Sequence, residues 1–360
     1  MRYFTLSLFL VFTYCNLFAQ QSDPWYAFYN QDSTLIGFKD GLSYVKIKPK
    51  FEGVTRANRF DDILAATEKN NGQWNSFYLT KSGRKIGHDS LHIIDNGADC
   101  ESEGFIRFRD PQTYLTGLFN RNGDIVIPAM YSGLTRVHNG LLVALKGATK
   151  KRVGIDSLIT WVGGEEVLLD TSNNVIIADF KYQPTLNFFS LQKTKELLDD
   201  PARISFVGND GLHYSFINFQ KEFENWLKTD LLVDLTKSKL LTATYPKVTW
   251  ETSIAWETSD KIVFIEHNFD LIKNKLMEIT NSDTDYFISA DGLNPFMFDT
   301  PEFQKYFNNC GESKDWQYPT MSIIISHKNK KDMVQDHLEF LRTDEGYQLL
   351  CVTIRKGQLK

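Results

Sequence analysis

Residues 37–54 read GFKDGLSYVKIKPKFEGV, and residues 117–134 read GLFNRNGDIVIPAMYSGL. The two stretches share a glycine beside an apolar residue, a polar turn, a β-rich run interrupted by proline, and a final glycine beside an apolar residue. A recurring unit of this size indicates an array of small β units, none of which buries its apolar face alone. The repeat predicts much of the architecture and little of the biochemistry.

The hairpin signal is clearest in the second stretch. A strand expected at 114–120 is followed by a turn at 121–124 and a return strand at 125–127. Asn-Gly between β-rich runs favours a hairpin because both residues tolerate positive φ. Pro128 cannot donate to a strand ladder, so we expect the return strand to end or to reach a sheet edge there. A further strand is expected at 141–145.

Three other units follow the same order. The expected strands are 35–38, 44–47 and 63–67 in the first unit, 76–80 and 105–108 in the second, and 167–170 and 175–177 in the fourth. Gly37, Phe77 and Gly117 lie forty residues apart, which supports the second unit although it lacks the proline. We therefore expect residues 25–182 to form one β-repeat domain.

The apolar period changes near Pro184. The segment 186–198 is expected to be a helix or an irregular crossing segment, and Phe216 to Leu227 has the apolar stripe of an amphipathic helix. The other expected elements are helices at 231–244, ended by Pro246, and from Ser259-Asp260 onward, then strands at 321–326, 334–341 and 347–355. Helices followed by an antiparallel sheet predict an α+β domain at 205–360, with the boundary between 183 and 205.

Residues 1–19 are typical of a secretory signal. Arg2 precedes an apolar run at 6–12 that is too short to span a bilayer, and a cleavage region follows Ala19. A lipoprotein anchor on Cys15 is the less favoured alternative, because Tyr14 occupies a position that usually holds a small residue. We expect an exported protein, periplasmic, cell-surface or extracellular, with no transmembrane segment.

Charge and cysteine content narrow the class of protein further. Loss of Arg2 with the signal changes the formal net charge from -5 to -6, and this mild acidity, spread along the chain, argues against a nucleic-acid surface. Three cysteines then remain, Cys100, Cys310 and Cys351. An exported chain can oxidise one pair and leave one thiol free, but so few cysteines make no disulfide scaffold, and we favour structural thiols in apolar surroundings.

The N-terminal units resemble WG repeats, a family of short β repeats found mainly in bacterial proteins. The matching positions are Gly37, Gly41, Pro49 and Phe51 in the first copy and Gly117, Gly123, Pro128 and Tyr131 in the third. Ile36 and Thr116 stand where the family has its tryptophan, while the spacing is retained. WG repeats are known as architectural or recognition modules without shared catalytic residues. The resemblance therefore implies structural roles: glycines at turns, prolines at strand ends and aromatic residues in the stack.

The C-terminal region is loosely similar to nuclear transport factor 2-like domains. The order of the expected helices, Tyr245-Pro246 and a final hairpin ending at 346–349 carry this resemblance, and no residue motif contributes to it. Domains of that shape often enclose a pocket, and the pocket is catalytic in some of them.

One cluster of polar residues invites a metal-site interpretation. Its members, within a stretch of thirteen residues, are His88, Asp89, His92, Asp95, Asp99 and Cys100. Two histidines four residues apart meet on a helix, but Gly87 and the β-rich run 91–94 favour a strand, where that step separates the rings by roughly 13 Å. We favour a polar loop in an eroded repeat. The segment starting at Asn281 begins like a calcium loop but has Tyr286 and Gly292 where the motif requires Gly and Glu.

The best acid/base candidates lie in the expected strand 334–341. They are Asp336, His337 and Glu339, with His327 nearby, and alternation places His337 and Glu339 on one face. We favour a solvated strand face over a catalytic site. Ser-x-x-Lys occurs at 82–85 and 190–193, but neither companion motif of serine acyl-transfer enzymes follows.

The sequence therefore predicts an exported two-part protein, an array of antiparallel β-hairpin repeats followed by an α+β domain with an antiparallel sheet. We expect a noncatalytic recognition or structural module, without cofactor or metal, that contacts a protein or a polysaccharide. The alternative is a C-terminal domain that binds or hydrolyses a small molecule and is presented by the repeats. A deep pocket containing His337 and a carboxylate would favour this alternative, whereas a centre filled by Phe and Tyr side chains would count against it.

Overall fold

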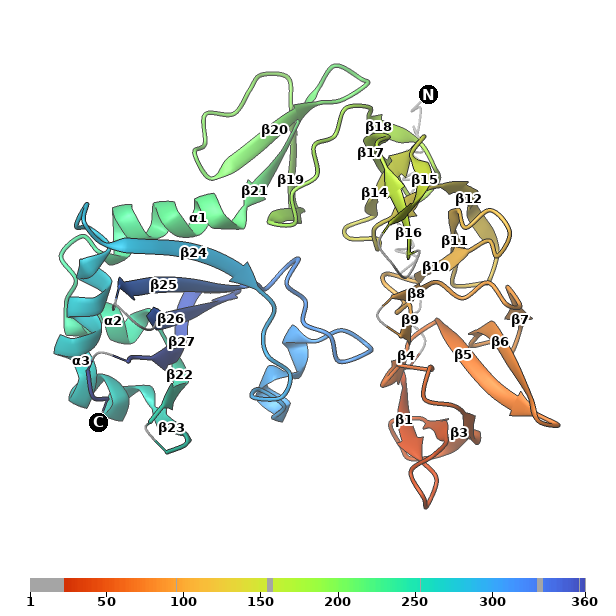
Figure 1. Cartoon of the computed structure of the whole chain (residues 1–360), viewed down its shortest axis with the longest axis horizontal. Coiled ribbons are helices and arrows are strands. Elements are labelled where there is room, and N and C mark those ends of the chain that lie inside the picture. The colour runs from red at the N-terminus through yellow and green to blue at the C-terminus, as the bar shows by residue number, and fades with distance from the viewer. Residues whose placement is uncertain are drawn as a thin grey trace, which may run out of the picture.

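The computed structural model describes residues 23–94, 96–153, 158–252, 254–328, 333–355 and 357–359. As predicted, an antiparallel β array is followed by a smaller α+β region (Figure 1). The expected signal at 1–19 lies outside the described residues. Over the described ranges, no helix is long and apolar enough to cross a membrane.

Four three-stranded antiparallel units follow one another in the array. They are β1 (Trp25–Tyr29), β2 (Ile36–Lys39) and β3 (Val45–Phe51); β5 (Ile63–Asn70), β6 (Gln73–Thr80) and β7 (Lys85–Ile86); β10 (Phe105–Arg109), β11 (Thr116–Asn120) and β12 (Ile125–Tyr131); and β14 (Leu141–Lys146), β17 (Glu165–Asp170) and β18 (Val175–Ile177). The short strands between units are β4 (Arg59–Phe60), β8 (Ile93–Ile94), β9 (Gly97–Ala98) and β13 (Gly133–Leu134). The hairpin of β15 (Thr149–Val153) and β16 (Leu158–Val162) is inserted in the fourth unit and accounts for its wider spacing.

The strand register is the same in the first, third and fourth units. The equivalent pairs are Phe38–Ile47, Leu118–Ile127 and Leu168–Ile177, and a bulge lies beside each. The second unit has a shorter return strand, and Tyr78 pairs with Ile86 without a bulge. The first, third and fourth units therefore share one hairpin geometry, and the second departs from it in its shorter, unbulged return strand.

Each hairpin turn is closed by a side chain at the same position. An oxygen of this side chain accepts the backbone N–H four residues later; the four bonds run from Tyr44 to Asp40 (2.9 Å), Arg84 to Thr80 (3.2 Å), Asp124 to Asn120 (3.0 Å) and Asn174 to Asp170 (2.9 Å). Short polar side chains favour turns because they satisfy local backbone groups in this way.

Two repeat glycines allow the return strand to approach the preceding strand closely. A Cβ atom on Gly37 would lie 2.6 Å from the carbonyl oxygen of Ile47, and one on Gly117 would lie 2.7 Å from that of Ile127. These glycines lie within strands, whereas Gly123 adopts a φ of 80° in the turn that follows. The first glycine of the repeat is thus needed at the bulge, because the backbone of the return strand occupies the space that a side chain would fill.

The two repeat prolines lie inside return strands, not at the strand ends that the resemblance implies. Pro49 belongs to β3, and Pro128 belongs to β12, which is an edge strand of its sheet. An edge strand tolerates proline because its outer N–H groups have no ladder partner. The expectation that the strand reaches an edge at Pro128 is confirmed.

The second, third and fourth units are buried on both faces by their neighbours, whereas the first unit is covered on one face only. In β6, Phe77 and Leu79 pack toward the first unit, while Tyr78 packs toward the third. In β14, Leu142 packs toward the third unit, while the adjacent Leu141 and Val143 pack toward the sheet that follows the fourth unit. The strands therefore read as continuous apolar runs, which is what burial on two sides requires.

A fifth sheet ends the array. It consists of β19 (Leu186–Thr194), β20 (Arg203–Val207) and β21 (His213–Asn218). Phe188 and Phe216 of this sheet pack against Leu168 and Phe180 of the fourth unit. The expectation of a helix or irregular segment at 186–198 is wrong, because residues 186–194 form β19, whose Leu186 and Phe188 pack against the fourth unit. The expected domain boundary between 183 and 205 falls inside this sheet.

Three helices begin the α+β region. They are α1 (Phe219–Trp226), which continues into a π-helical turn (Leu227–Leu231), α2 (Lys237–Thr242) and α3 (Lys261–Glu278). Asp260 caps α3 as expected, accepting the N–H of Ile262 at 2.8 Å. The expected helix at 231–244 is confirmed only for 237–242. Pro246 does not end it but lies inside a strand, and Phe216 precedes α1 rather than belonging to it.

One six-stranded sheet forms the rest of this region, in the order β23-β22-β27-β26-β25-β24. Its strands are β22 (Thr244–Glu251), β23 (Trp256–Asp260), β24 (Asp285–Asp291), β25 (Thr320–Lys328), β26 (Met333–Thr343) and β27 (Gly346–Thr353). β22 runs parallel to β27, and the other neighbours are antiparallel. The three expected C-terminal strands are confirmed.

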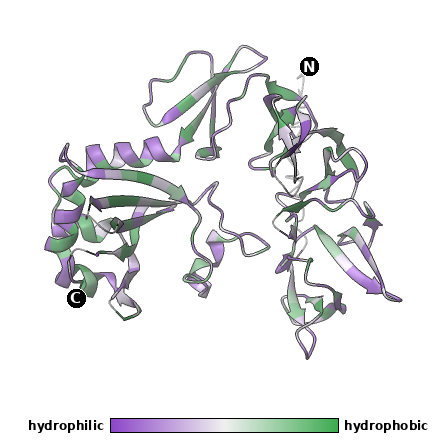
Figure 2. Ribbon diagram, in the orientation of Figure 1, coloured by the Kyte–Doolittle hydropathy of each residue, from purple (hydrophilic) through white to green (hydrophobic). Residues whose placement is uncertain are grey.

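The two faces of this sheet have different covers. The helices pack on one face, around a core that includes Phe223, Phe264 and Phe340 (Figure 1). The other face packs against residues 292–319, which we call the docking segment and which contains a 3-10 helix (Pro301–Tyr306, η2). Hydrophobic residues concentrate in the sheets, and hairpin tips such as that between β5 and β6 are hydrophilic (Figure 2).

We predict that Gly37→Ala destabilises the protein by about 1–3 kcal/mol, because the added methyl group overlaps the return strand. Gly41→Ala is the matched control in the same hairpin, since a Cβ atom there has nothing within 4 Å. Urea denaturation followed by tryptophan fluorescence measures both. Equal midpoints for the two variants would contradict the role assigned to Gly37.

Candidate binding cleft

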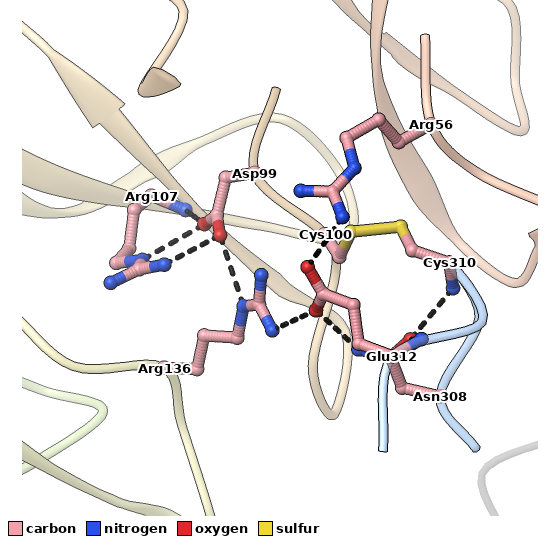
Figure 3. The surroundings of a disulfide bond; sticks show 8 residues. All are labelled: Arg56, Asp99, Cys100, Arg107, Arg136, Asn308, Cys310 and Glu312. Carbon is pink, nitrogen blue, oxygen red and sulfur yellow. Dashed lines mark hydrogen bonds and ion pairs between the residues drawn. A yellow bond between two sulfur atoms is a disulfide. The ribbon is translucent and has the colours of Figure 1, made fainter. Parts of the chain in front are cut away.

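A disulfide bond joins the docking segment to the array. Cys100 and Cys310 are bonded across a sequence separation of 210 residues (Figure 3). The expectation of unpaired thiols is wrong for this pair, while Cys351 is free and buried. The pairing depends on the docking segment folding back on the array, and the sequence has no local signal for that approach.

A chain of ion pairs runs beside the disulfide. Asp99 is buried and receives two hydrogen bonds from the Arg107 guanidinium, at 2.6 and 2.9 Å, and a third from Arg136 at 3.0 Å (Figure 3). Arg136 also pairs with Glu312 of the docking segment, which contacts Arg56 at 3.0 Å. Burial alone would raise the pKa of Asp99, but the two guanidinium groups outweigh it and hold that pKa well below its usual range.

Backbone and ring contacts complete the junction. The carbonyl oxygen of Asn309 accepts the N–H groups of Asn58 at 2.8 Å and Arg59 at 3.0 Å. The rings of His138 and Trp316 stack with centroids 4.4 Å apart. The docking segment is thus held to the array by covalent, ionic, backbone and aromatic contacts together.

A cleft of about 530 Å³ opens between the array and this segment. The array contributes Arg59, Asp61, Asp62, Glu101, Ser102, Glu103, Gly104, Arg121, His138 and Phe189, and the docking segment contributes Asn308, Asn309, Lys314, Trp316 and Gln317. Most of the array residues lie in turns that precede the first strand of successive units. These turns are equivalent, because Ile63, Phe105 and Leu141 occupy matching register positions at the strand starts. The cleft therefore follows a row of repeated turns.

Most carboxylates of the cleft already accept hydrogen bonds or form ion pairs within the array. Glu101 accepts the backbone N–H groups of Asp62 (2.8 Å), Ile63 (3.0 Å) and Gly104 (3.1 Å), and burial raises its pKa to about 7. Glu103 accepts two backbone N–H groups of the next turn, at 139 and 140. These acids hold the turns in place.

Two polar atoms at the cleft lack a partner. Within the described part of the chain, the Oδ1 atom of Asn309 and the Nδ1 atom of His138 are buried without a hydrogen bond. Burial, aided by Arg136, lowers the pKa of His138 to about 3, so its ring is neutral at neutral pH. Phe189 is 42% exposed beside them. The cleft thus combines neutral polar atoms with aromatic surface.

The residues of the expected metal cluster are separated by the fold. Cys100 is in the disulfide, Asp99 is bound by arginines, and His92 is buried with its Nε2 atom 3.4 Å from the Arg109 guanidinium. Asp95 lies outside the described residues. Among the residues that are described, no group of three or more His, Cys, Asp or Glu side chains is placed to hold a metal ion.

The acid/base candidates of β26 are also divided. Asp336 faces α3 and contacts the His327 Nε2 atom at 2.6 Å and the Lys275 Nζ atom at 2.8 Å. His337 and Glu339 share the opposite face, as alternation predicts; burial lowers the pKa of His337 and raises that of Glu339. The structure therefore brings Asp336 together with His327, and it does not bring His337 into that group.

Aromatic side chains fill the space between the helices and the sheet, where the resemblance to nuclear transport factor 2-like domains would place a pocket. They are Phe219, Phe223, Trp226, Trp250, Phe264, Phe340 and Tyr347. Asp336 and His327 are instead parts of a polar network that joins α3, β25 and β26.

No protein-family model matches this chain, and comparison with curated proteins gives no match. The interpretation of the cleft accordingly depends on its geometry. Sequence reasoning did not identify the cleft, although one signal was available. Short polar or glycine-containing turns recur before the strands at 63, 105 and 141, and such turns align on one side of a repeat array.

We predict that stability decreases on acidification through His92. Burial, aided by Arg107, lowers the pKa of His92 from 6.5 to about 3. Between these values the unfolded chain binds the proton and the folded chain does not, so the free energy of unfolding falls as pH decreases below about 6.5. His138 acts in the same direction, and Glu101, with its raised pKa, acts in the opposite direction between about 4.5 and 7.

The variant His92→Gln isolates this effect. Urea unfolding at pH 7 and pH 5 should show a loss of stability that is smaller than in the unchanged protein by on the order of 1–2 kcal/mol. An identical pH dependence in both proteins would show that His92 titrates normally in the fold.

We also predict one free thiol in the chain lacking residues 1–19. Iodoacetamide added to the denatured, unreduced protein should label Cys351 only, and labelling after reduction should reach all three cysteines. Mass spectrometry of the peptides assigns each site. Labelling of Cys100 and Cys310 before reduction would mean that the disulfide does not form.

Proposed function

We propose that this chain is an exported, noncatalytic recognition protein of the bacterial envelope or exterior. In this proposal a WG-type repeat array is followed by a nuclear transport factor 2-like domain, and a partner is held in the cleft between the array and the docking segment. The observation that carries the proposal is the cleft itself, whose two walls come from distant parts of the chain and are locked by the Cys100–Cys310 disulfide.

Several features support the separate parts of the proposal. Disulfides persist in oxidising compartments, which agrees with export. The register shared by three units supports a WG-type repeat, and the placement of the β22–β23 hairpin and α3 before four further strands supports the second resemblance. A site formed on turns that a rigid scaffold positions is a common arrangement for binding.

The chemistry of the cleft supports binding over catalysis. Its buried acid Glu101 is occupied by three backbone N–H groups, and Arg59 is occupied by Asp61 at 2.7 and 2.8 Å. A general acid or base needs access to the atom with which it exchanges a proton. The alternative of a hydrolytic or small-molecule-binding C-terminal domain gains no support from its aromatic core.

We predict that Trp316→Ala abolishes retention of the purified protein on envelope material from its source organism. The substitution removes the ring that the docking segment contributes to the cleft. Co-sedimentation of the protein with the insoluble envelope fraction measures retention.

Trp74→Ala is the matched control, because Trp74 is 59% exposed at the tip of the β5–β6 hairpin and does not line the cleft. Thermal melting of both variants verifies that they fold. If Trp316→Ala sediments as well as the unchanged protein, the cleft is not the recognition site.

A further inference from the structure

We propose that the cleft binds an uncharged polysaccharide chain. The inference rests on the proposed function and names the chemical class of the partner. It depends on three properties of the cleft: its course along the repeats, its unpartnered polar atoms with adjacent aromatic surface, and its balance of charge.

The course of the cleft suits a linear ligand. Successive repeats contribute Asp61-Asp62, Glu103-Gly104 and His138, so similar turns recur along its length. Its volume of about 530 Å³ lies in the range of roughly 300–1,000 Å³ typical of sites for small organic molecules. A short stretch of a longer chain fits this space, with the remainder of the chain outside.

The polar atoms that lack partners favour hydroxyl groups. Asn309 is 5% exposed, and its buried Oδ1 atom accepts no hydrogen bond among the described residues, so this acceptor favours a ligand group that can donate. The Nδ1 atom of neutral His138 is likewise unpartnered. A hydroxyl group both donates and accepts, whereas a carboxylate or phosphate oxygen at neutral pH only accepts.

Aromatic surface adjoins these atoms. Trp316 and Phe189 come from opposite walls of the cleft, and both are partly accessible. A sugar ring presents C–H groups on its faces and hydroxyl groups at its edge, and this combination suits an aromatic ring beside amide and imidazole groups.

The cleft is lined by four acidic and three basic residues, and two of the basic residues, Arg59 and Arg121, are matched by carboxylates, while the Lys314 Nζ atom donates to the carbonyl oxygen of Lys305. Arg59 pairs with Asp61, and Arg121 lies 3.7 Å from Asp62. Glu103 is occupied by backbone N–H groups. A polyanion or a polycation would have to disrupt these pairs, while a neutral chain leaves them intact.

A peptide partner is the less favoured class. Extended peptides bind proteins by adding a strand to an exposed sheet edge, where free backbone groups form the ladder. The array side of the cleft consists mainly of turns, and Glu101 and Glu103 already occupy backbone N–H groups there. This wall therefore offers hydrogen bonds from side chains more than from a strand edge.

The test uses co-sedimentation of the mature protein with insoluble envelope material in three forms: untreated, digested with protease, and oxidised with periodate, which cleaves sugar diols. We expect protease digestion to leave retention unchanged and periodate to abolish it. Raising NaCl from 50 to 500 mM should change the apparent affinity less than about twofold, because a neutral ligand releases no counterions.

Two variants connect the result to the cleft. Phe189→Ala truncates a ring that is 42% exposed and should weaken retention by about tenfold without changing the melting temperature. Trp74→Ala should leave retention unchanged.

The outcomes separate the class of partner from the function itself. Loss of retention on protease digestion but not on periodate oxidation would overturn the polysaccharide assignment and leave recognition by the cleft intact. A strong salt dependence would point to a charged polymer and would also overturn it. Retention that is insensitive to both Phe189→Ala and Trp316→Ala would overturn the proposed function together with this inference.

Discussion

The structure depends on the burial of small β units against one another, and the second, third and fourth units each lie between two neighbours. A three-stranded hairpin unit has no third layer of its own, so its apolar side chains are buried only when a neighbour covers them. Phe77 and Tyr78 are adjacent in β6 and fully buried, yet they belong to different interfaces. Removal of one unit would expose a face of each neighbour. The fifth sheet covers the fourth unit by the same principle, with Phe188 and Phe216.

The same stacking aligns the turns on which the cleft is formed. Because the repeats share their register, the turns before β5, β10 and β14 are placed alike, and the docking segment closes over this row. Asp99 connects the two parts, since it binds Arg107 of the array and Arg136, which in turn binds Glu312. A buried carboxylate requires such partners, because desolvation without them is costly. The walls of the cleft are therefore held in part by contacts that lie outside it.

Local patterns predicted those elements whose residues contain their own signal. The Asn-Gly turn, the shared spacing around Gly37 and Gly117 and the capping Asp260 all specify short-range geometry, and each element was found where expected. The segment at 186–198 was misassigned because its aromatic residues are compatible with a helix and with a buried strand. Packing against the fourth unit selects the strand. The helix expected from 231 is shorter because Thr236 caps it later, and Pro246 is accommodated in β22.

By itself, the sequence determined the hairpin units and their order, because turn chemistry and apolar alternation act between residues close in the chain. The tertiary structure alone decided that Cys100 meets Cys310, that Asp336 pairs with His327 and Lys275, and that a cleft exists at the docking segment. Each of these outcomes brings together groups that lie on different strands or far apart in the chain. Such contacts are set by how whole sheets pack on one another, and no local pattern encodes that packing.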